Sequence, residues 1–233
     1  MPNKRLEAKA EMALNGIGEN EESIGNIGKG YRSHESRLSH LAGLAIYYSI
    51  VAQLQIPFDQ IIAEIRAITP RAEILVEEVP APQKLAPFSI ALTADVLEDA
   101  ATGRFVLLHD PKGQEGWSGE YRCVTFVRAA IDLSMAADPM LSDVGWSWLV
   151  EALKKYDCQY EAPSGTVTRV ASVSYGMLEG REDDSEMEVR ASWTPTSGSG
   201  IANHVRAWLD LLGLSAALEP IPDGVTQLSP HRK

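Results

Sequence analysis

The sequence predicts an α+β fold, a mostly antiparallel sheet of five or six strands with helices packed on one face. Strand-like segments occur in clusters joined by turn-rich loops, instead of alternating strictly with helices. Amphipathic helical segments stand at the start, in the middle and at the end of the chain. The 233 residues are 45% hydrophobic and 23% charged, which supplies enough apolar material for a packed core.

One domain is expected over residues 38–225, between a flexible tail at 1–37 and a shorter tail at 226–233. Residues 1–37 are rich in Glu, Asn and Gly and show no apolar period. A first helix, which Ser39 can cap, is expected to run to about Leu54. Its polar side chains favour burial against protein over a membrane anchor, because polar groups are costly inside a bilayer.

Three further helices are expected. One follows Pro57 and ends before Pro70, because the residue that precedes a proline avoids the α region. The next follows Asp143, which is expected to cap it, and the last covers residues 201–214. Trp148 and Trp208 lie on the apolar stripes of these last two helices and are expected in the core.

Six segments are expected to form strands. They are residues 72–79, 88–96, 104–109, 121–129, 165–174 and 186–193. Residues 88–96 alternate apolar and polar side chains, which is typical of a half-buried antiparallel strand. Residues 104–109 are apolar on both faces, which indicates a central strand. The turn-rich stretches 110–120 and 179–186 are expected to be loops that join neighbouring strands.

The net charge and the cysteine content restrict the classes of function that this chain can have. The formal net charge of -11 favours solubility and opposes non-specific nucleic-acid binding, which depends on a basic surface. No tight sequence-independent binding to RNA or DNA is therefore expected. Cys123 and Cys158 are the only cysteines, so one disulfide is conceivable but a disulfide framework is excluded. The chain does not open on a signal-peptide pattern, so a cytoplasmic location is expected.

The sequence contains none of the common motifs for catalysis, metal binding or cofactor binding. The five histidines show neither H-x-x-x-H nor H-E-x-x-H spacing, so no metal site is expected. The segment GWSWL at 145–149 lacks the second glycine of a nucleophile elbow. No glycine-rich segment follows a strand and opens a helix, so no cofactor is expected.

The segment LLHDPKGQEGWSGEYR, residues 107–122, is the most suggestive of a ligand site. A histidine can transfer a proton, an aspartate can orient it, a tryptophan can stack on a ligand, and an arginine can hold an anion. The residues in these roles are His109, Asp110, Trp117 and Arg122. The favoured interpretation is structural, because Asp-Pro followed by glycine is a common turn in which the aspartate caps its own backbone.

A second candidate site is a set of arginines on predicted strands. Its members are Arg122, Arg128, Arg169 and Arg190. Arginines on neighbouring strands can line one sheet face and hold a carboxylate or a phosphate. They can equally pair across strands with acidic side chains, and this interpretation is favoured. The available carboxylates are Glu186, Glu188 and Asp95.

Several strings together resemble domain-of-unknown-function family 3000, which occurs in high-GC Gram-positive bacteria. They are VEEVPAPQKLAP, FVLLHDPKGQEGW, YRCVTFVRA, VGWSWLVEAL, SGTVTRV and VRASWTP. The resemblance runs from about Phe58 to Val225, and residues 1–57 lie outside the family pattern. It implies a cytoplasmic bacterial protein, with no activity, cofactor or catalytic residue to carry over. It also implies an association with a ribonuclease D-like exonuclease, beside which family members are often encoded.

Three hypotheses follow from the sequence. The leading one is a non-catalytic binding or accessory protein, with its protein partner left open. The second is an accessory factor in RNA processing that acts with a ribonuclease D-like exonuclease. The third is an enzyme of unknown class that uses the His109–Arg122 segment. A flat or apolar exposed patch, an arginine-lined sheet face and a pocket around His109 would respectively favour these three.

Overall fold

The computed structural model describes residues 56–179 and 184–219. The helices within these residues are α3 (Phe58–Arg66), α4 (Leu133–Ala137), α5 (Leu141–Lys155) and α6 (Ile201–Ser215). The strands are β1 (Ile74–Val79), β2 (Phe88–Val96), β3 (Ala101–Gln114), β4 (Gly119–Ala130), β5 (Tyr160–Ser172) and β6 (Asp184–Pro195). Two short 3-10 helices are η1 (Leu97–Asp99) and η2 (Gly176–Leu178).

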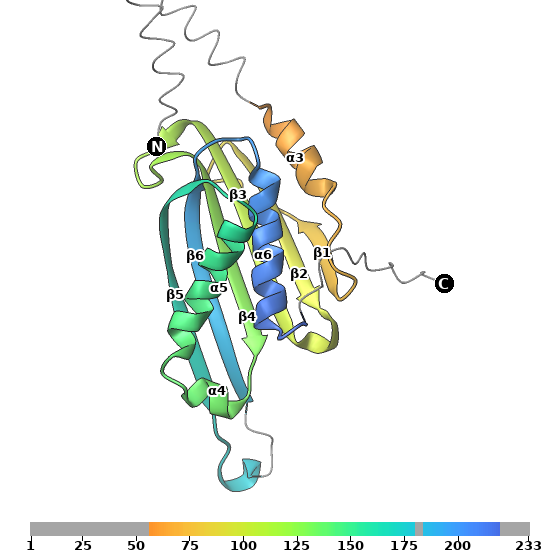
Figure 1. Cartoon of the computed structure of the whole chain (residues 1–233), viewed down its shortest axis with the longest axis vertical. Coiled ribbons are helices and arrows are strands. Elements are labelled where there is room, and N and C mark those ends of the chain that lie inside the picture. The colour runs from red at the N-terminus through yellow and green to blue at the C-terminus, as the bar shows by residue number, and fades with distance from the viewer. Residues whose placement is uncertain (1–55, 180–183, 220–233) are drawn as a thin grey trace, which may run out of the picture. The chain divides into compact units, whose positions relative to one another are not determined.

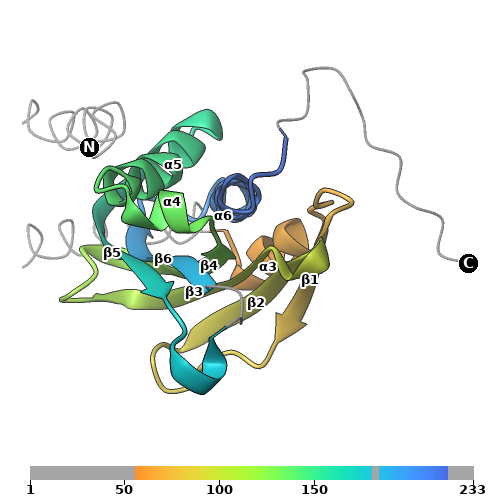
Figure 2. The same cartoon turned by 90° about the horizontal axis from the view of Figure 1, so that it is seen from below.

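The strands of the described residues form one antiparallel sheet with the order β1-β2-β3-β4-β6-β5. Figure 1 shows α5 and α6 lying along the sheet, and Figure 2 shows α3, α4, α5 and α6 on the same side of it. The predicted α+β fold class, with helices on one face, is therefore confirmed. None of the α-helices α3, α4, α5 and α6 lies on the opposite side of the sheet (Figure 2).

The core lies between the sheet and these helices. Alternation within each strand sends every second side chain toward the helices. Strand β2 follows the predicted pattern from Ile90 onward, with Ile90, Leu92, Ala94 and Val96 buried, whereas Phe88 at its start is 45% exposed. The predicted stripe of α3 is also confirmed, since Ile61 and Ile65 are buried against the same core. Fully buried aromatic side chains at its centre are Phe105, Trp193 and Trp208.

Several details differ from the sequence-based expectations. Helix α5 begins at Leu141, so Asp143 lies in its first turn and makes no side-chain cap. Trp208 is fully buried as predicted, but Trp148 is only half-buried at the edge of the core. The short helix α4 was not predicted, because five residues carry too little periodicity to detect.

The expected loop at 110–120 is mostly strand. Strand β3 runs to Gln114 and β4 starts at Gly119, so the hairpin is longer than its turn residues suggest. The register shifts between His109 and Gln114, and this irregularity accommodates the Asp-Pro-Lys-Gly sequence within the ladder.

Some predictions lie outside the described residues. The helix expected at about 39–54 is one of them, and so are the domain boundaries at 37/38 and 225/226 and most of the acidic loop at 179–186. In residues 56–179 and 184–219, no helix has the length and hydropathy that crossing a membrane requires.

Candidate functional site

The side of the sheet away from the helices is called here the open face. It carries Arg104, Val106 and Leu108 from β3, Arg122, Val124, Phe126 and Arg128 from β4, and Glu186, Glu188, Arg190, Ser192 and Thr194 from β6. The register aligns these side chains in rows across the strands. One row contains Arg104, Phe126 and Arg190, the next contains Val106, Val124 and Ser192, and the third contains Leu108, Arg122 and Thr194.

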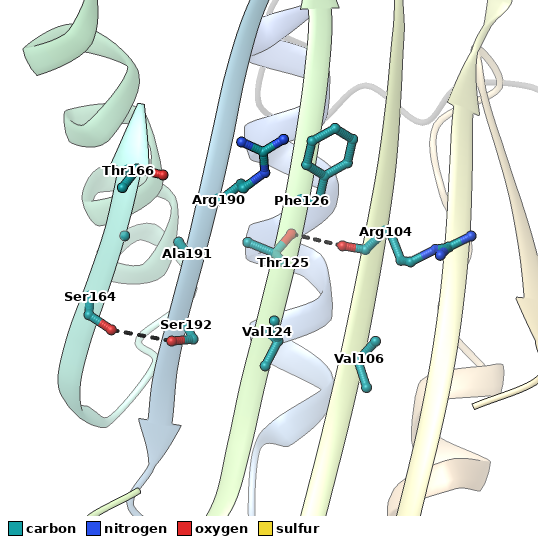
Figure 3. A pocket seen from close by; sticks show the side chains of 11 residues that line it. Arg104, Val106, Val124, Thr125, Phe126, Ser164, Thr166, Arg190, Ala191 and Ser192 are labelled. Atoms are coloured by element: carbon teal, nitrogen blue, oxygen red, sulfur yellow. Dashed lines mark hydrogen bonds between the residues drawn. The ribbon is translucent and has the colours of Figure 1, made fainter. Parts of the chain in front are cut away.

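A shallow groove of about 490 Å³ runs over the first two rows and reaches β5. Its apolar lining comes from Val106, Val124 and Phe126, and Val124 remains 39% exposed in the middle of the sheet. Its polar lining comes from Arg104, Arg190, Ser164 and Ser192 (Figure 3). Ser164 on β5 and Ser192 on β6 leave the hollow, because their side chains are smaller than those on β3 and β4.

Arg122 lies just outside the groove, where it contacts two residues of the lining, Ser164 and Ser192. Its side chain crosses β6 toward β5, and the residue is only 9% exposed. Nη1 donates hydrogen bonds to the Ala162 carbonyl at 3.1 Å and to the Thr194 hydroxyl at 3.0 Å. Nη2 donates to the hydroxyls of Ser164 at 3.2 Å and Ser192 at 2.6 Å. The guanidinium is thus well hydrogen-bonded, but all four acceptors are neutral.

Burial changes the electrostatics of the Arg122 guanidinium. Among the described residues no ion pair involves Arg122. Burial lowers the pKa of its guanidinium, because the charged form loses hydration. Ala162, which accepts one of its hydrogen bonds, has a positive φ of 47° at a register shift in β5. Arg122 therefore also supports an irregular part of the edge strand.

The other arginines of the open face differ in their pairing. The Arg190 guanidinium contacts the Glu188 carboxylate at 2.6 Å and lies over the Phe126 ring, 5.3 Å from its centroid. Arg128 lies 3.7 Å from the Glu186 carboxylate. Arg104 is exposed, and its side chain makes no hydrogen bond or ion pair within residues 56–179 and 184–219. Sequence reasoning missed Arg104, although it opens the strand segment at 104–109.

Arg169 does not share this face. Its guanidinium donates to the backbone carbonyls of Ala136, at 3.1 Å, and Asp138. These carbonyls belong to α4 and the residue after it, on the helix side of the sheet. Three of the four predicted arginines therefore lie together, and two of those three are paired with Glu186 and Glu188, as the cross-strand interpretation expected.

His109 lies on the helix side and is separated from Arg122 by the sheet. Its ring stacks on Tyr121 with centroids 4.3 Å apart, and the rings of Phe58 and Phe88 each lie 5.6 Å away. The residue is 7% exposed, and neither ring nitrogen has a hydrogen-bond partner among the described residues. Burial lowers the pKa of the imidazole, against a smaller opposing effect of Asp110. The His109 side chain is therefore uncharged at neutral pH and packs as an aromatic ring among its neighbours.

Asp110 and Trp117 take structural positions in the β3–β4 hairpin. Oδ1 of Asp110 accepts a hydrogen bond from the Lys112 backbone N–H at 3.0 Å, as in the turn that the sequence favoured. The Trp117 carbonyl accepts a hydrogen bond from the Thr194 hydroxyl. Since Thr194 also accepts from Arg122, the tip of the hairpin is connected to the Arg122 network.

Cys123 and Cys158 are free and buried. Burial raises the pKa of both thiols, that of Cys158 to about 12, so both stay protonated at neutral pH. In the described part of the chain no group of three or more His, Cys, Asp or Glu side chains is arranged to hold a metal ion.

Comparison with known proteins gives one match. The family model described as "Protein of unknown function (DUF3000)" matches residues 55–226. No curated protein and no solved structure gives a significant match.

Proposed function

Because this chain belongs to the DUF3000 family, whose description assigns no activity, we propose from its own geometry that it is a non-catalytic binding or accessory protein. The binding surface is the open face. The observation that carries the proposal is the row of Val106 and Val124 in the middle of this face, beside the buried Arg122 and beside Arg104, which makes no ion pair among the described residues. Apolar side chains rimmed by polar ones are typical of an interaction surface.

The surroundings of the catalytic candidates support binding over catalysis. His109 and Arg122 point to opposite faces of the sheet, so they have no common substrate position. His109 is enclosed by aromatic rings, and both thiols are held protonated. Two free buried cysteines also suit a reducing compartment, so the cytoplasm is the proposed location.

A pair of matched substitutions tests this role. Val124→Asp places a charge in the middle of the open face, whereas Val150→Asp makes the same change at a valine of similar exposure on α5. Partners are captured from cells of the source organism with the wild-type chain and both variants, and quantified by mass spectrometry. We expect Val124→Asp to lose partners that the wild type and Val150→Asp retain. Identical partners for all three chains would refute the proposal.

A second candidate is an accessory role in RNA processing beside a ribonuclease D-like exonuclease. The specific observation is that Arg104, Arg122, Arg128 and Arg190 share one sheet face. Against it, Glu186 and Glu188 lie among these arginines and the net charge is -11, both of which repel phosphates.

A salt series with labelled single-stranded RNA separates the two roles. We expect no micromolar binding at physiological salt. Micromolar binding that falls steeply with salt, and that Arg128→Ala weakens while Arg169→Ala on the other face does not, would favour the RNA role instead.

A further inference from the structure

We propose that the free edge of β5 pairs with the same edge of a second copy of this chain, so that two sheets join into one across a two-fold axis at Thr168. This edge differs from the groove of the open face, and its pairing does not depend on the ligand of that groove. The exposure of the edge, its lack of protection and the match of the strand to itself support this pairing.

Strand β5 lies at one edge of the sheet and pairs, among the described strands, only with β6 (Figure 1). Seven of the eight residues from 165 to 172 are exposed, and only Val167 is half-buried. Their backbone groups make no hydrogen bond outside the β5–β6 ladder within residues 56–179 and 184–219. Because alternate N–H and C=O groups of an antiparallel strand point away from its neighbour, this stretch presents a free ladder to an incoming strand.

Most of β5 lacks the features that usually protect an edge strand, which are a proline, a bulge or a charged side chain. Its start is protected by Pro163 and by the register shift that ends at Ser164. From Ser164 to Ser172 the register with β6 is continuous and contains no proline. The single charge in this run belongs to Arg169, whose guanidinium donates to backbone carbonyls of α4 and the residue after it instead of extending past the edge.

The opposite edge strand, β1, is protected. It has six residues, against thirteen in β5, and two of them are the acidic residues Glu77 and Glu78. Glu78 also forms an ion pair with Arg66 of α3 at 2.9 Å. A short strand with neighbouring like charges opposes pairing with another copy of itself. Of the two edges, β5 is therefore the one that suits self-association.

The continuous run of β5 matches itself in the antiparallel direction. Its ends, Ser164 and Ser172, are equally distant from Thr168, so a two-fold axis there pairs the whole run with its copy. Thr168 then lies opposite its own equivalent, and Thr166 lies opposite the partner's Val170. Thr–Thr pairs can hydrogen-bond across strands, and β-branched side chains suit a pleated surface.

Charge and chain geometry favour this axis over the neighbouring positions. Residues directly opposite each other in an antiparallel pair share a face, so the axis passes through a residue and not between two. An axis at Arg169 would place two guanidinium groups opposite each other. An axis at Val167 would bring Pro163 into the new ladder, where a proline cannot donate. The axis at Thr168 avoids both, because Arg169 then lies opposite the partner's Val167.

The pairing also has a consequence for the open face. Because the two-fold axis is perpendicular to the sheet, both open faces lie on the same side of the joined sheet. Ser164 and Thr166 line the groove where it reaches β5. In the pair they lie opposite the partner's Ser172 and Val170, so side chains of the second copy extend the groove beyond β5.

Sedimentation velocity of the full chain over a concentration series tests the association. We expect a species with twice the mass of one chain at micromolar concentration. Each copy carries a formal net charge of -11, so added salt should strengthen the association by screening the repulsion. A chain that stays monomeric up to hundreds of micromolar at high salt would refute the inference, whereas the capture experiment would still decide the role of the open face.

Charged variants locate the association at β5. Thr168→Lys places two like charges opposite each other at the axis and should weaken the association at least fivefold. Mixing this variant with Thr168→Asp should restore it, because opposite charges then meet. The matched control, Leu75→Lys, puts the same charge in the same row of the open face but on β1, and should have no effect. An association that Thr168→Lys leaves unchanged would overturn the inference.

A cross-link tests the register. Under mild oxidation Thr168→Cys should form a disulfide with its copy, because the two Cβ atoms lie about 4.5–5.5 Å apart. Thr166→Cys is the matched control, since its two equivalents lie four residues apart along the ladder, or about 13–14 Å, which is too far for a disulfide. Cys123 and Cys158 are buried, so they should not compete. Equal cross-linking of both variants, or none of Thr168→Cys, would overturn the axis at Thr168.

Discussion

The two faces of the sheet are built from the same strands, but the side chains of one face are buried against helices and those of the other are largely exposed. On the helix side, β4 contributes Cys123 and Val127, which are fully buried. On the open face, it contributes Val124, Phe126 and Arg128, which remain wholly or partly exposed. Side chains one residue apart thus serve packing on one side and surface chemistry on the other.

This difference indicates where the sequence is free to serve function. Burial on the helix side is continuous across the sheet, and its side chains are constrained by volume. The open face has few such constraints, yet it holds a buried guanidinium and exposed valines that folding alone does not require. Substitutions on the helix side should therefore mainly lower stability, whereas substitutions on the open face should mainly affect binding.

The largest stability effect is expected for Trp208→Ala on the helix side. Trp208 is fully buried and lies 5.5 Å from Phe105 between ring centroids. Truncation of a core tryptophan costs about 3–5 kcal/mol, against a typical total stability of about 5–15 kcal/mol. Chemical denaturation should show this loss, whereas Val124→Ala should cost less than about 1 kcal/mol. Comparable losses for both would mean that the open face is packed in solution.

Acidification should lower the stability of the fold through His204, which lies on α6. This residue is buried and accepts a hydrogen bond at Nδ1 from the Trp193 indole N–H at 2.9 Å, and burial lowers its pKa to about 4. The unfolded chain then binds the proton more tightly, at a pKa of about 6.5. Stability conferred by neutral His204 is therefore present above pH 6.5 and is lost as the pH falls toward 4.

The difference between wild type and His204→Gln isolates this effect. A shift from about 6.5 to about 4 corresponds to roughly 3 kcal/mol over the window. Glutamine can accept the Trp193 hydrogen bond but does not titrate there. The stability advantage of the wild type over the variant should shrink from pH 7 to pH 4, and contributions from other groups largely cancel. A constant difference would show that His204 does not titrate differently in the two states.

A steric prediction concerns the edge strand. A Cβ at Gly165 would lie 2.4 Å from the Arg190 carbonyl oxygen and 2.7 Å from the Trp146 ring, so Gly165→Ala must displace β5 from β6. Overpacking of this kind costs about 1–3 kcal/mol. Gly116→Ala is the matched control, because a Cβ there meets nothing within 4 Å. Hydrogen exchange should accelerate in β5 for the first variant only.

Much of the fold could be predicted because burial on the helix side of the sheet produces a periodic pattern of apolar residues in the sequence. Alternation in residues 88–96 and the stripe of Trp208 both report burial on one face, and both are confirmed. Gly165 was a missed signal, since a glycine inside a strand often marks close backbone approach. The longer β3–β4 hairpin was missed because turn residues were read as the end of pairing.

The candidate site was less predictable, for a physical reason. Arg122, Arg128 and Arg190 were identified from strand positions, but whether an arginine faces helices or solvent depends on register. Arg169 pairs with Met187 and so turns to the helix side, where α4 supplies its carbonyl acceptors. His109 and Arg122 are close in sequence, yet their positions on paired strands have opposite parity. Sequence proximity alone does not separate the two faces.

The smallest stability effects are expected for the surface arginines of the open face. Arg104 has no described partner, and Arg128 is 48% exposed and lies 3.7 Å from the Glu186 carboxylate. An exposed ion pair contributes about 0–1 kcal/mol, because water and salt screen the charges. Arg104→Gln and Arg128→Gln should therefore each change the free energy of unfolding by less than about 0.5 kcal/mol.

Denaturation at low and at physiological salt measures both variants against the wild type. Added salt should reduce any effect of Arg128→Gln further, since it screens the pair with Glu186. A loss above about 1 kcal/mol for Arg104→Gln would mean that this side chain stabilises the fold through a contact outside the described residues. If both variants are as stable as expected, any loss of ligand binding by Arg104→Gln must arise at the surface itself, because the sheet that presents it is unchanged.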